Sequence, residues 1–130
     1  MRILFACVGN SARSQMAEGF AKHYSDDIQA TSAGTSPASK ISKKAVKVMS
    51  EKGIDISQQK PSLINPSEVK DVDLIITMGC GPDACPTAPP EKVREWKIDD
   101  PCGRSIEDFR KIRDKIENKV RELIKEIRSD

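Results

Sequence analysis

The sequence predicts an α/β fold in which helices pack against a parallel sheet, because strand-like apolar runs alternate with segments of helical periodicity. Residues 2–6 (Arg-Ile-Leu-Phe-Ala) and residues 73–78 (Asp-Leu-Ile-Ile-Thr-Met) are almost continuously apolar, which is typical of strands buried on both faces. Between positions 106 and 127, apolar residues instead recur at helical spacing.

The first part of the chain is expected to form a strand, a loop, a helix and a second strand. A polar, glycine-containing loop at 7–13 follows the strand at 2–6, and a helix begins at about Ser14. A short strand is expected at 28–32, because the chain then turns at Gly34. The apolar face of the helix consists of Met16, Phe20 and Tyr24.

A second helix is expected to start at Thr35-Ser36-Pro37, since small hydroxyl side chains cap helices and proline fits the first turn. Gly53 is expected to end it in a left-handed conformation. The apolar stripe of this helix consists of Ile41, Ala45, Val48 and Met49.

The rest of the chain is expected to alternate loops with short elements before a last helix. Residues 55–66 are polar and contain two prolines, so they are expected to form a loop, followed by a helical turn at 66–70. No regular element is expected at 79–90, which contains four prolines. A short strand is expected at 94–98, and the final helix begins at about Ser105.

The composition indicates one domain, residues 1–130, without a surface dedicated to nucleic acid or membrane. With 37% hydrophobic residues, 130 residues suffice for one domain but not for two domains with independent cores. The 22 Lys and Arg residues are interleaved with 20 Asp and Glu residues, which argues against a nucleic-acid partner. The apolar run near the start is too short for a signal peptide or a membrane span. We therefore expect a cytoplasmic protein.

The four cysteines are too few for a disulfide scaffold and should rest mostly as thiols in the cytoplasm. Such thiols suggest catalysis, metal binding or redox exchange. The alternative is a buried cysteine that acts only as a small hydrophobic residue.

The loop after the first strand is the main candidate for a functional site, because ligands of open parallel sheets bind beyond the carboxyl ends of strands. Its backbone amides and the following helix start are expected to cradle a tetrahedral oxyanion. Gly9 and Asn10 tolerate the left-handed conformations that a tight cradle requires. The oxyanion is expected to bind to Val8, Gly9, Asn10, Ser11, Ala12 and Arg13.

Cys7 lies at the mouth of this loop and is the expected nucleophile. The loop amides, the helix start and the guanidinium of Arg13 all favour a thiolate over a thiol, and a thiolate there would attack the central atom of the anion. Ser14 can donate to the Cys7 sulfur or simply cap the helix. The alternative for the whole loop is an ordinary turn with a structural cysteine.

The sequence at 7–14, together with Asp100-Pro101, resembles low-molecular-weight protein tyrosine phosphatases. It resembles still more the arsenate reductases that share their fold and are coupled to thioredoxin. The resemblance covers essentially the whole chain. It implies three layers, with a four-stranded parallel sheet flanked by helices, no cofactor, and a role in arsenical resistance.

The resemblance implies that Asp100 is the general acid. A residue before proline is held in an extended conformation, which can keep a carboxylate on a loop that faces the site. Without the oxyanion loop, the Asp-Pro pair would indicate only a turn.

The resemblance also assigns a disulfide relay to Cys80 and Cys85. In the implied mechanism Cys7 attacks arsenate, Cys80 attacks Cys7 and expels arsenite, and Cys85 attacks Cys80, after which a thioredoxin-type protein reduces the pair. In a helix, residues five apart lie roughly 8–9 Å apart by Cα, too far for a disulfide at about 4.4–6.8 Å, so this segment must be a loop or melt. Two structural thiols, or zinc bound with Cys102, remain alternatives.

Two other functions stay open at this point. A low-molecular-weight protein tyrosine phosphatase would share the first step and pass through a phosphocysteine. A non-catalytic thiol protein would hold arsenite or zinc. The resemblance also suggests a potassium ion at Asn10 and Glu18, although no acidic partner is found near Ser62.

Overall fold

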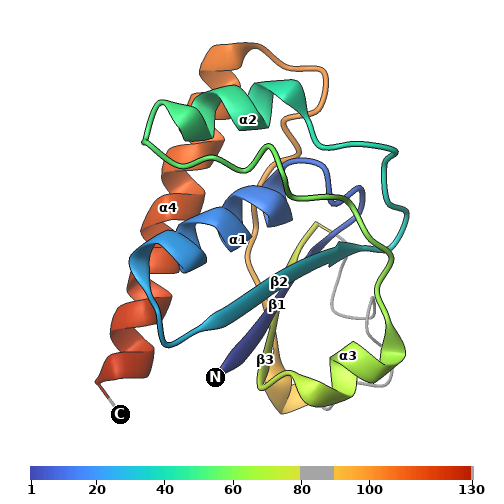
Figure 1. The fold of residues 1–130 in the computed structure, drawn as a ribbon, viewed down its shortest axis with the longest axis vertical. Helices are drawn as coiled ribbons and strands as arrows, with labels where there is room; N and C mark the ends of the chain where they lie inside the picture. The colour runs from blue at the N-terminus through green and yellow to red at the C-terminus, as the bar shows by residue number, and fades with distance from the viewer. Residues whose placement is uncertain (80–89, 130) are drawn as a thin grey trace.

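The computed structural model describes residues 1–79 and 90–129, which form a parallel sheet with helices on both faces, as the sequence predicts (Figure 1). The sheet has four strands in the order β2-β1-β3-β4, and neighbouring strands are parallel. The strands are β1 (Arg2–Cys7), β2 (Gln29–Gly34), β3 (Leu74–Met78) and β4 (Val93–Glu95). The helices of the described residues are α1 (Arg13–Tyr24), α2 (Lys43–Ser50), α3 (Pro66–Asp71) and α4 (Ile106–Arg128), with a 3-10 turn, η2 (Pro90–Lys92).

The register of the sheet brings three strand ends to one edge. Cys7, the last residue of β1, pairs with Gly34 of β2 on one side and with Met78 of β3 on the other. The loop from Cys7 to α1 therefore starts at the edge of the sheet where ligands of open parallel folds bind.

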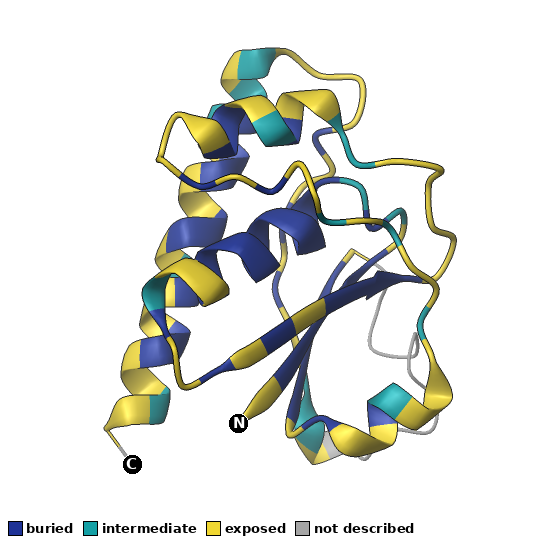
Figure 2. Cartoon of the chain, viewed as in Figure 1, coloured by how far each residue is buried: buried dark blue, intermediate teal, exposed yellow. Residues whose placement is uncertain are grey.

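The sheet separates two apolar cores, which accounts for the three layers. Ile3 and Phe5 of β1 lie in the larger core, which α1, α2 and α4 cover. Leu4 faces the other side and packs with Val69 of α3 in a smaller core. Figure 2 shows that the first two turns of α1 are buried, whereas α3 is mostly exposed. Because β1 is buried on both faces, its apolar run is continuous rather than alternating.

Several predicted boundaries are confirmed to within about one residue. They include the first strand, the first helix, the turn at Pro66 and the last helix, whose N-cap Ser105 accepts a hydrogen bond from the backbone of Asp108. Gly53 follows α2 with a φ of 76°, and Ile54 N donates to Met49 O across it, so the left-handed end of this helix is also confirmed.

The predicted start of the second helix at Thr35 is wrong, because α2 begins at Lys43 with Ser42 as its N-cap. The backbone of the intervening segment bonds to the loop after β1 instead. Thr35 N donates to Cys7 O, and further backbone bonds join the two segments as far as Ser42 N and Ser11 O. Ser42 N, which in a helix from Thr35 would donate to Ala38 O, donates to Ser11 O instead, so this segment follows the loop rather than a helical path.

The second and fourth strands differ from their predicted ranges. β2 extends two residues beyond the predicted end at 32, because it pairs with β1 as far as Gly34. β4 ends at Glu95 instead of 98, because the chain then leaves the sheet towards the loop after β1. Of the helices described, none combines the length and the apolar character needed to cross a membrane.

Candidate active site

The sulfur of Cys7 lies at the base of the loop after β1 and faces the polar groups of that loop. It accepts a hydrogen bond from Asn10 N at 3.2 Å and lies 2.9 Å from Ser14 Oγ. Ser14 lies inside α1, and its hydroxyl contacts the sulfur rather than capping the helix, whose N-cap is Ala12. The arrangement places the predicted nucleophile within a ring of hydrogen-bond donors.

The direction of the hydrogen bonds around Ser14 follows from one backbone donor. Ser62 N donates to Asn10 Oδ1 at 2.8 Å, which leaves Asn10 Nδ2 to donate to Ser14 Oγ at 2.7 Å. The Ser14 hydroxyl accepts this bond and lies beside the Cys7 sulfur, and either of these two atoms can be the donor of the bond between them. If Cys7 is a thiolate, the sulfur can only accept, so Ser14 Oγ and Asn10 N would both donate to it and stabilise its charge.

The backbone of Asn10 adopts the left-handed conformation that the sequence predicts, with a φ of 49°. Its carbonyl accepts a hydrogen bond from the buried side chain of Gln15, and Gln59 in turn donates to Gln15 Oε1. The prediction for Gly9 is wrong, because the glycines with positive φ among the described residues are Gly53, Gly79 and Gly103. A single left-handed residue therefore suffices to turn this loop.

The loop also presents backbone donors without protein acceptors. Within the described part of the chain, no protein acceptor is found for the N–H groups of Gly9, Ser11, Ala12, Arg13 and Ser14. Consecutive free N–H groups at the start of a helix are the ordinary way in which proteins bind phosphate-like anions. The geometry therefore agrees with the predicted oxyanion cradle.

Arg13 and Asp100 come together at the edge of this cradle. The Arg13 side chain is buried, donates through NH1 to Ile98 O at 3.0 Å, and lies 3.8 Å through NH2 from Asp100 Oδ2. Asp100 also accepts a hydrogen bond from Cys102 N at 3.0 Å, while 61% of its side chain stays exposed. The structure thus brings the predicted nucleophile, guanidinium and acid to one edge of the sheet.

The predicted relay falls largely outside the described residues. Cys80 and Cys85 lie in the segment 80–89, so their predicted roles are untested. The pairing of Cys7 with Met78 confirms that the two strands are neighbours, as the relay requires. Cys102 is a free, exposed cysteine on the loop that carries Asp100. In the described ranges no group of three His, Cys, Asp or Glu residues is arranged to hold a metal.

The two residues suggested for potassium already have protein partners. Asn10 is bonded to Ser14 and Ser62, as described above. The Glu18 carboxylate accepts a hydrogen bond from Ser32 Oγ and forms an ion pair with Lys22. A potassium ion on Glu18 would share the carboxylate with the Ser32 hydroxyl and the Lys22 ammonium, and its binding stays a prediction.

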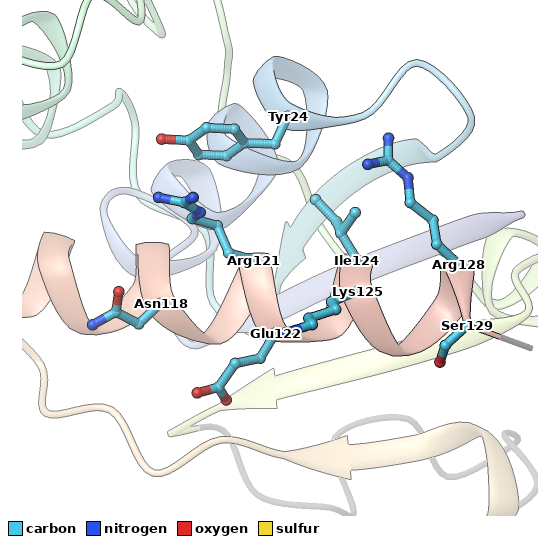
Figure 3. Close-up of a pocket in the computed structure, with 8 residues that line it drawn as sticks. All are labelled: Tyr24, Asn118, Arg121, Glu122, Ile124, Lys125, Arg128 and Ser129. Atoms are coloured by element: carbon cyan, nitrogen blue, oxygen red, sulfur yellow. The ribbon is translucent and has the colours of Figure 1, made fainter.

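An open hollow lies away from this loop (Figure 3). Its volume is about 680 Å³, and it includes no residue of the oxyanion loop. Its lining residues are Tyr24, Asn118, Arg121, Glu122, Ile124, Lys125, Arg128 and Ser129. Tyr24 donates a hydrogen bond to Glu117, which raises the pKa of the Tyr24 hydroxyl. This bond joins α1 to α4, so the Tyr24 hydroxyl contributes to the packing of the two helices.

Sequence reasoning missed several residues that shape the site. Gln15 is a fully buried polar residue in the first turn of α1, and its position beside an apolar stripe was the available signal. The sequence at Gly34 indicates only a turn, yet a Cβ there would lie 2.5 Å from Val8 O. No local pattern could show that close approach, because it depends on how two strands end side by side.

Comparisons with known proteins agree with this geometry. The family model described as low molecular weight phosphotyrosine protein phosphatase matches residues 2–130, so the chain belongs to this family. Within it, the chain is similar to arsenate reductases. It is 43% identical over 130 residues to the arsenate reductase of Bacillus subtilis, covering 93% of each chain. It is 36% identical to the putative arsenate reductase of Halobacterium salinarum, with 97% of this chain and 92% of that one covered.

Solved structures show both enzyme types on this fold. An arsenate reductase in the phosphate-binding state has a TM-score of 0.85 and 38% identity, with 97% and 98% of the two chains covered. The YwlE arginine phosphatase with a phosphorylated active-site serine has a TM-score of 0.91 and 25% identity, covering 100% of this chain and 97% of that one. The thioredoxin-dependent arsenate reductase of Corynebacterium glutamicum has a TM-score of 0.85 and 34% identity, covering 98% of this chain and 61% of that one.

Proposed function

We propose that the chain is an arsenate reductase that binds arsenate in the loop after β1 and reduces it to arsenite through Cys7. The contact of the Cys7 sulfur with Asn10 N and Ser14 Oγ carries this proposal, because it aims a stabilised sulfur at the centre of an anion cradle. The similarity to curated arsenate reductases supports arsenate as the anion.

In the first step, the Cys7 sulfur attacks the arsenic atom and an As–O bond breaks. Asp100 supplies the proton, so that the departing oxygen leaves as water. Arg13 and the free backbone N–H groups stabilise the negative charge on the remaining oxygens. The product of this step is an arsenic(V) adduct joined to Cys7 through an S–As bond, and no electrons have yet been transferred to arsenic.

In the second step, Cys80 attacks the Cys7 sulfur and the S–As electron pair passes to arsenic, which leaves as arsenite. Cys85 then attacks Cys80, which frees Cys7 and leaves an 80–85 disulfide. The hydrogen bond from Ser14 helps Cys7 to leave as a thiolate. The position of Met78 beside Cys7 supports this relay, since the residues after β3 continue from the edge where the nucleophile lies.

A thioredoxin-type dithiol protein completes the cycle by reducing the 80–85 disulfide. The similarity to a reductase described as thioredoxin-dependent supports such a donor. The cycle requires a reducing compartment, and the cytoplasm is the location that we propose.

Protein phosphatase activity is the second candidate function. The family match and the similarity to arginine phosphatases favour it, because the same cradle holds phosphate. Cys7 would then form a phosphocysteine, and water would release the phosphate without any use for a thiol pair.

A single-turnover experiment distinguishes the two functions. The reduced protein is mixed with arsenate without external reductant, and disulfides are mapped by mass spectrometry. A reductase yields one arsenite and one 80–85 disulfide per chain, and Cys80→Ser or Cys85→Ser prevents recycling of Cys7 while sparing hydrolysis of an aryl phosphate. Hydrolysis without any arsenite would show that the protein is a phosphatase instead.

A further inference from the structure

Gly79 lies directly against the guanidinium of Arg13. It is the first residue after β3 and has a φ of 86°. A Cβ added at this position would overlap Arg13 Nη1 and lie 3.0 Å from its Cζ. Side-chain carbons do not approach that closely, so the Arg13 guanidinium fills the space that any side chain at 79 would need.

Gly79 contacts the Arg13 guanidinium from the β3 side, and the other contacts of the guanidinium come from different segments. Arg13 NH1 donates to Ile98 O at 3.0 Å, and NH2 faces the exposed Asp100 at 3.8 Å. The contact with Gly79 follows from the sheet register, because Met78 pairs with Cys7 and the next residue lies beside the start of the loop. Arg13 is thus held between the end of one strand and a backbone carbonyl from another segment.

We propose that Gly79 is a positioning residue, whose missing side chain keeps the Arg13 guanidinium where it can bind the oxyanion. The proposal rests on the oxyanion site of the proposed function. Gly79 does not need to touch the anion. Because the guanidinium is the flexible end of a side chain, a substitution at 79 is accommodated by moving it. The expected damage therefore falls on anion binding more than on folding.

Gly53 provides a matched control within the same chain. Its φ of 76° is close to that of Gly79, but an added Cβ would meet nothing within 4 Å. Gly53→Ala therefore introduces the backbone strain of an alanine at positive φ without displacing any side chain. The difference between the two variants isolates the contact with Arg13.

The test measures how well inorganic phosphate protects Cys7 from alkylation by iodoacetamide, followed by mass spectrometry of the Cys7 peptide in the full-length protein. In Gly79→Ala, the phosphate concentration that halves the alkylation rate should rise by about tenfold to hundredfold, the usual worth of a charge-assisted hydrogen bond. In Gly53→Ala this phosphate concentration should stay within about twofold of the wild-type value. The melting temperatures of Gly79→Ala and Gly53→Ala should fall by similar amounts. Gly79→Asn serves if the alanine variant does not fold, because asparagine tolerates positive φ yet carries a Cβ.

A double-mutant cycle identifies Arg13 as the group through which Gly79 acts. In an Arg13→Lys background, Gly79→Ala should change phosphate protection by less than about twofold, because no guanidinium remains to be displaced. Unchanged protection in Gly79→Ala, or an equal loss in the Arg13→Lys background, would overturn the positioning role while leaving the oxyanion site intact. Absence of protection in the wild-type protein would overturn the oxyanion site itself, and the positioning role with it.

Discussion

The two sides of the candidate site are held in different ways. On the nucleophile side, Cys7, Asn10 and Ser14 are at most 2% exposed and are joined by hydrogen bonds. On the acid side, the Asp100 side chain is 61% exposed and meets Arg13 only at 3.8 Å. The first side is a buried network of hydrogen-bonded side chains, and the second is an exposed carboxylate on a loop.

This difference matches the two chemical tasks. A charge that develops on sulfur and on the anion oxygens is best stabilised by dipoles that are fixed before the reaction. A general acid must instead exchange its proton with water between turnovers. We therefore expect substitutions on the nucleophile side to affect both folding and reactivity, and substitutions of Asp100 to affect chemistry alone.

The largest effect is expected from Cys7→Ser, which removes the proposed nucleophile. Arsenite release and aryl phosphate hydrolysis should both fall below detection. Cys102→Ser is the matched control, because Cys102 is exposed and its backbone, not its sulfur, contacts Asp100. The rates of arsenite release and aryl phosphate hydrolysis in Cys102→Ser should stay within about twofold of the wild-type rates. Turnover of Cys7→Ser at the wild-type rate would remove Cys7 from the mechanism.

Asp100→Asn should slow the first chemical step by about a hundredfold to ten-thousandfold, the usual contribution of a general acid. Its free energy of unfolding should change by less than about 0.5 kcal/mol, because the side chain is largely exposed and an amide oxygen can still accept from Cys102 N. The measurements are single-turnover arsenite release and urea denaturation. A large loss of stability would show that Asp100 contributes to the stability of the fold as much as the residues around Cys7 do.

Asn10→Ala should lower both the free energy of unfolding and the reactivity of Cys7. It deprives Ser62 N of its acceptor, leaves Ser14 without the donor that orients it, and puts alanine at positive φ. One buried and one partly buried hydrogen bond, together with one strained residue, correspond to about 2–4 kcal/mol of stability. Alkylation of Cys7 should also slow by about tenfold. The control is Asn118→Ala on the exposed surface of α4, which should change neither the stability nor the rate of Cys7 alkylation. Unaltered Cys7 reactivity in Asn10→Ala would mean that the network does not prepare the nucleophile.

The contrast also explains which parts of the site could be predicted from sequence. Cys7 and Arg13 are predicted because a strand, a polar loop and a helix follow one another locally, whereas Asp100 is predicted only from the resemblance to the family. The contacts of Asn10 with Ser62, and of Gly79 with Arg13, join segments far apart in the chain. Such contacts depend on how strands end side by side, which no local spacing encodes.

The same reasoning applies to the fold. Buried strands such as β1 and β3 were predicted because continuous apolar runs have few other uses in a small α/β protein. The start of α2 is misplaced because Ser42 N bonds to Ser11 O rather than to a carbonyl of its own segment. Long-range bonding to the oxyanion loop outweighed a local helix-start signal.

The smallest effect is expected at ion pairs that lie away from both the Cys7 side and the Asp100 side of the site. They test whether a change outside the site leaves the reactivity of Cys7 unaltered. Glu51, at the end of α2, is paired with Arg110 and Arg113 of α4. The hydrogen bond from Arg110 is the main cause that lowers the pKa of Glu51 from 4.5 to about 2. Because the folded pKa lies below the unfolded one, the stabilisation is complete above about pH 4.5 and is lost as the pH falls towards 2.

Glu51→Gln should therefore lower the melting temperature slightly at pH 7, and the gap from the wild-type protein should close as the pH falls from 4.5 towards 2. Glu122→Gln, an exposed change on α4, is the control for loss of a charge alone. Cys7 alkylation and its protection by phosphate should be unchanged in both variants. A gap that stays constant with pH would show that the ion pairs do not stabilise the fold, and altered Cys7 protection would show that α2 and α4 influence the site after all.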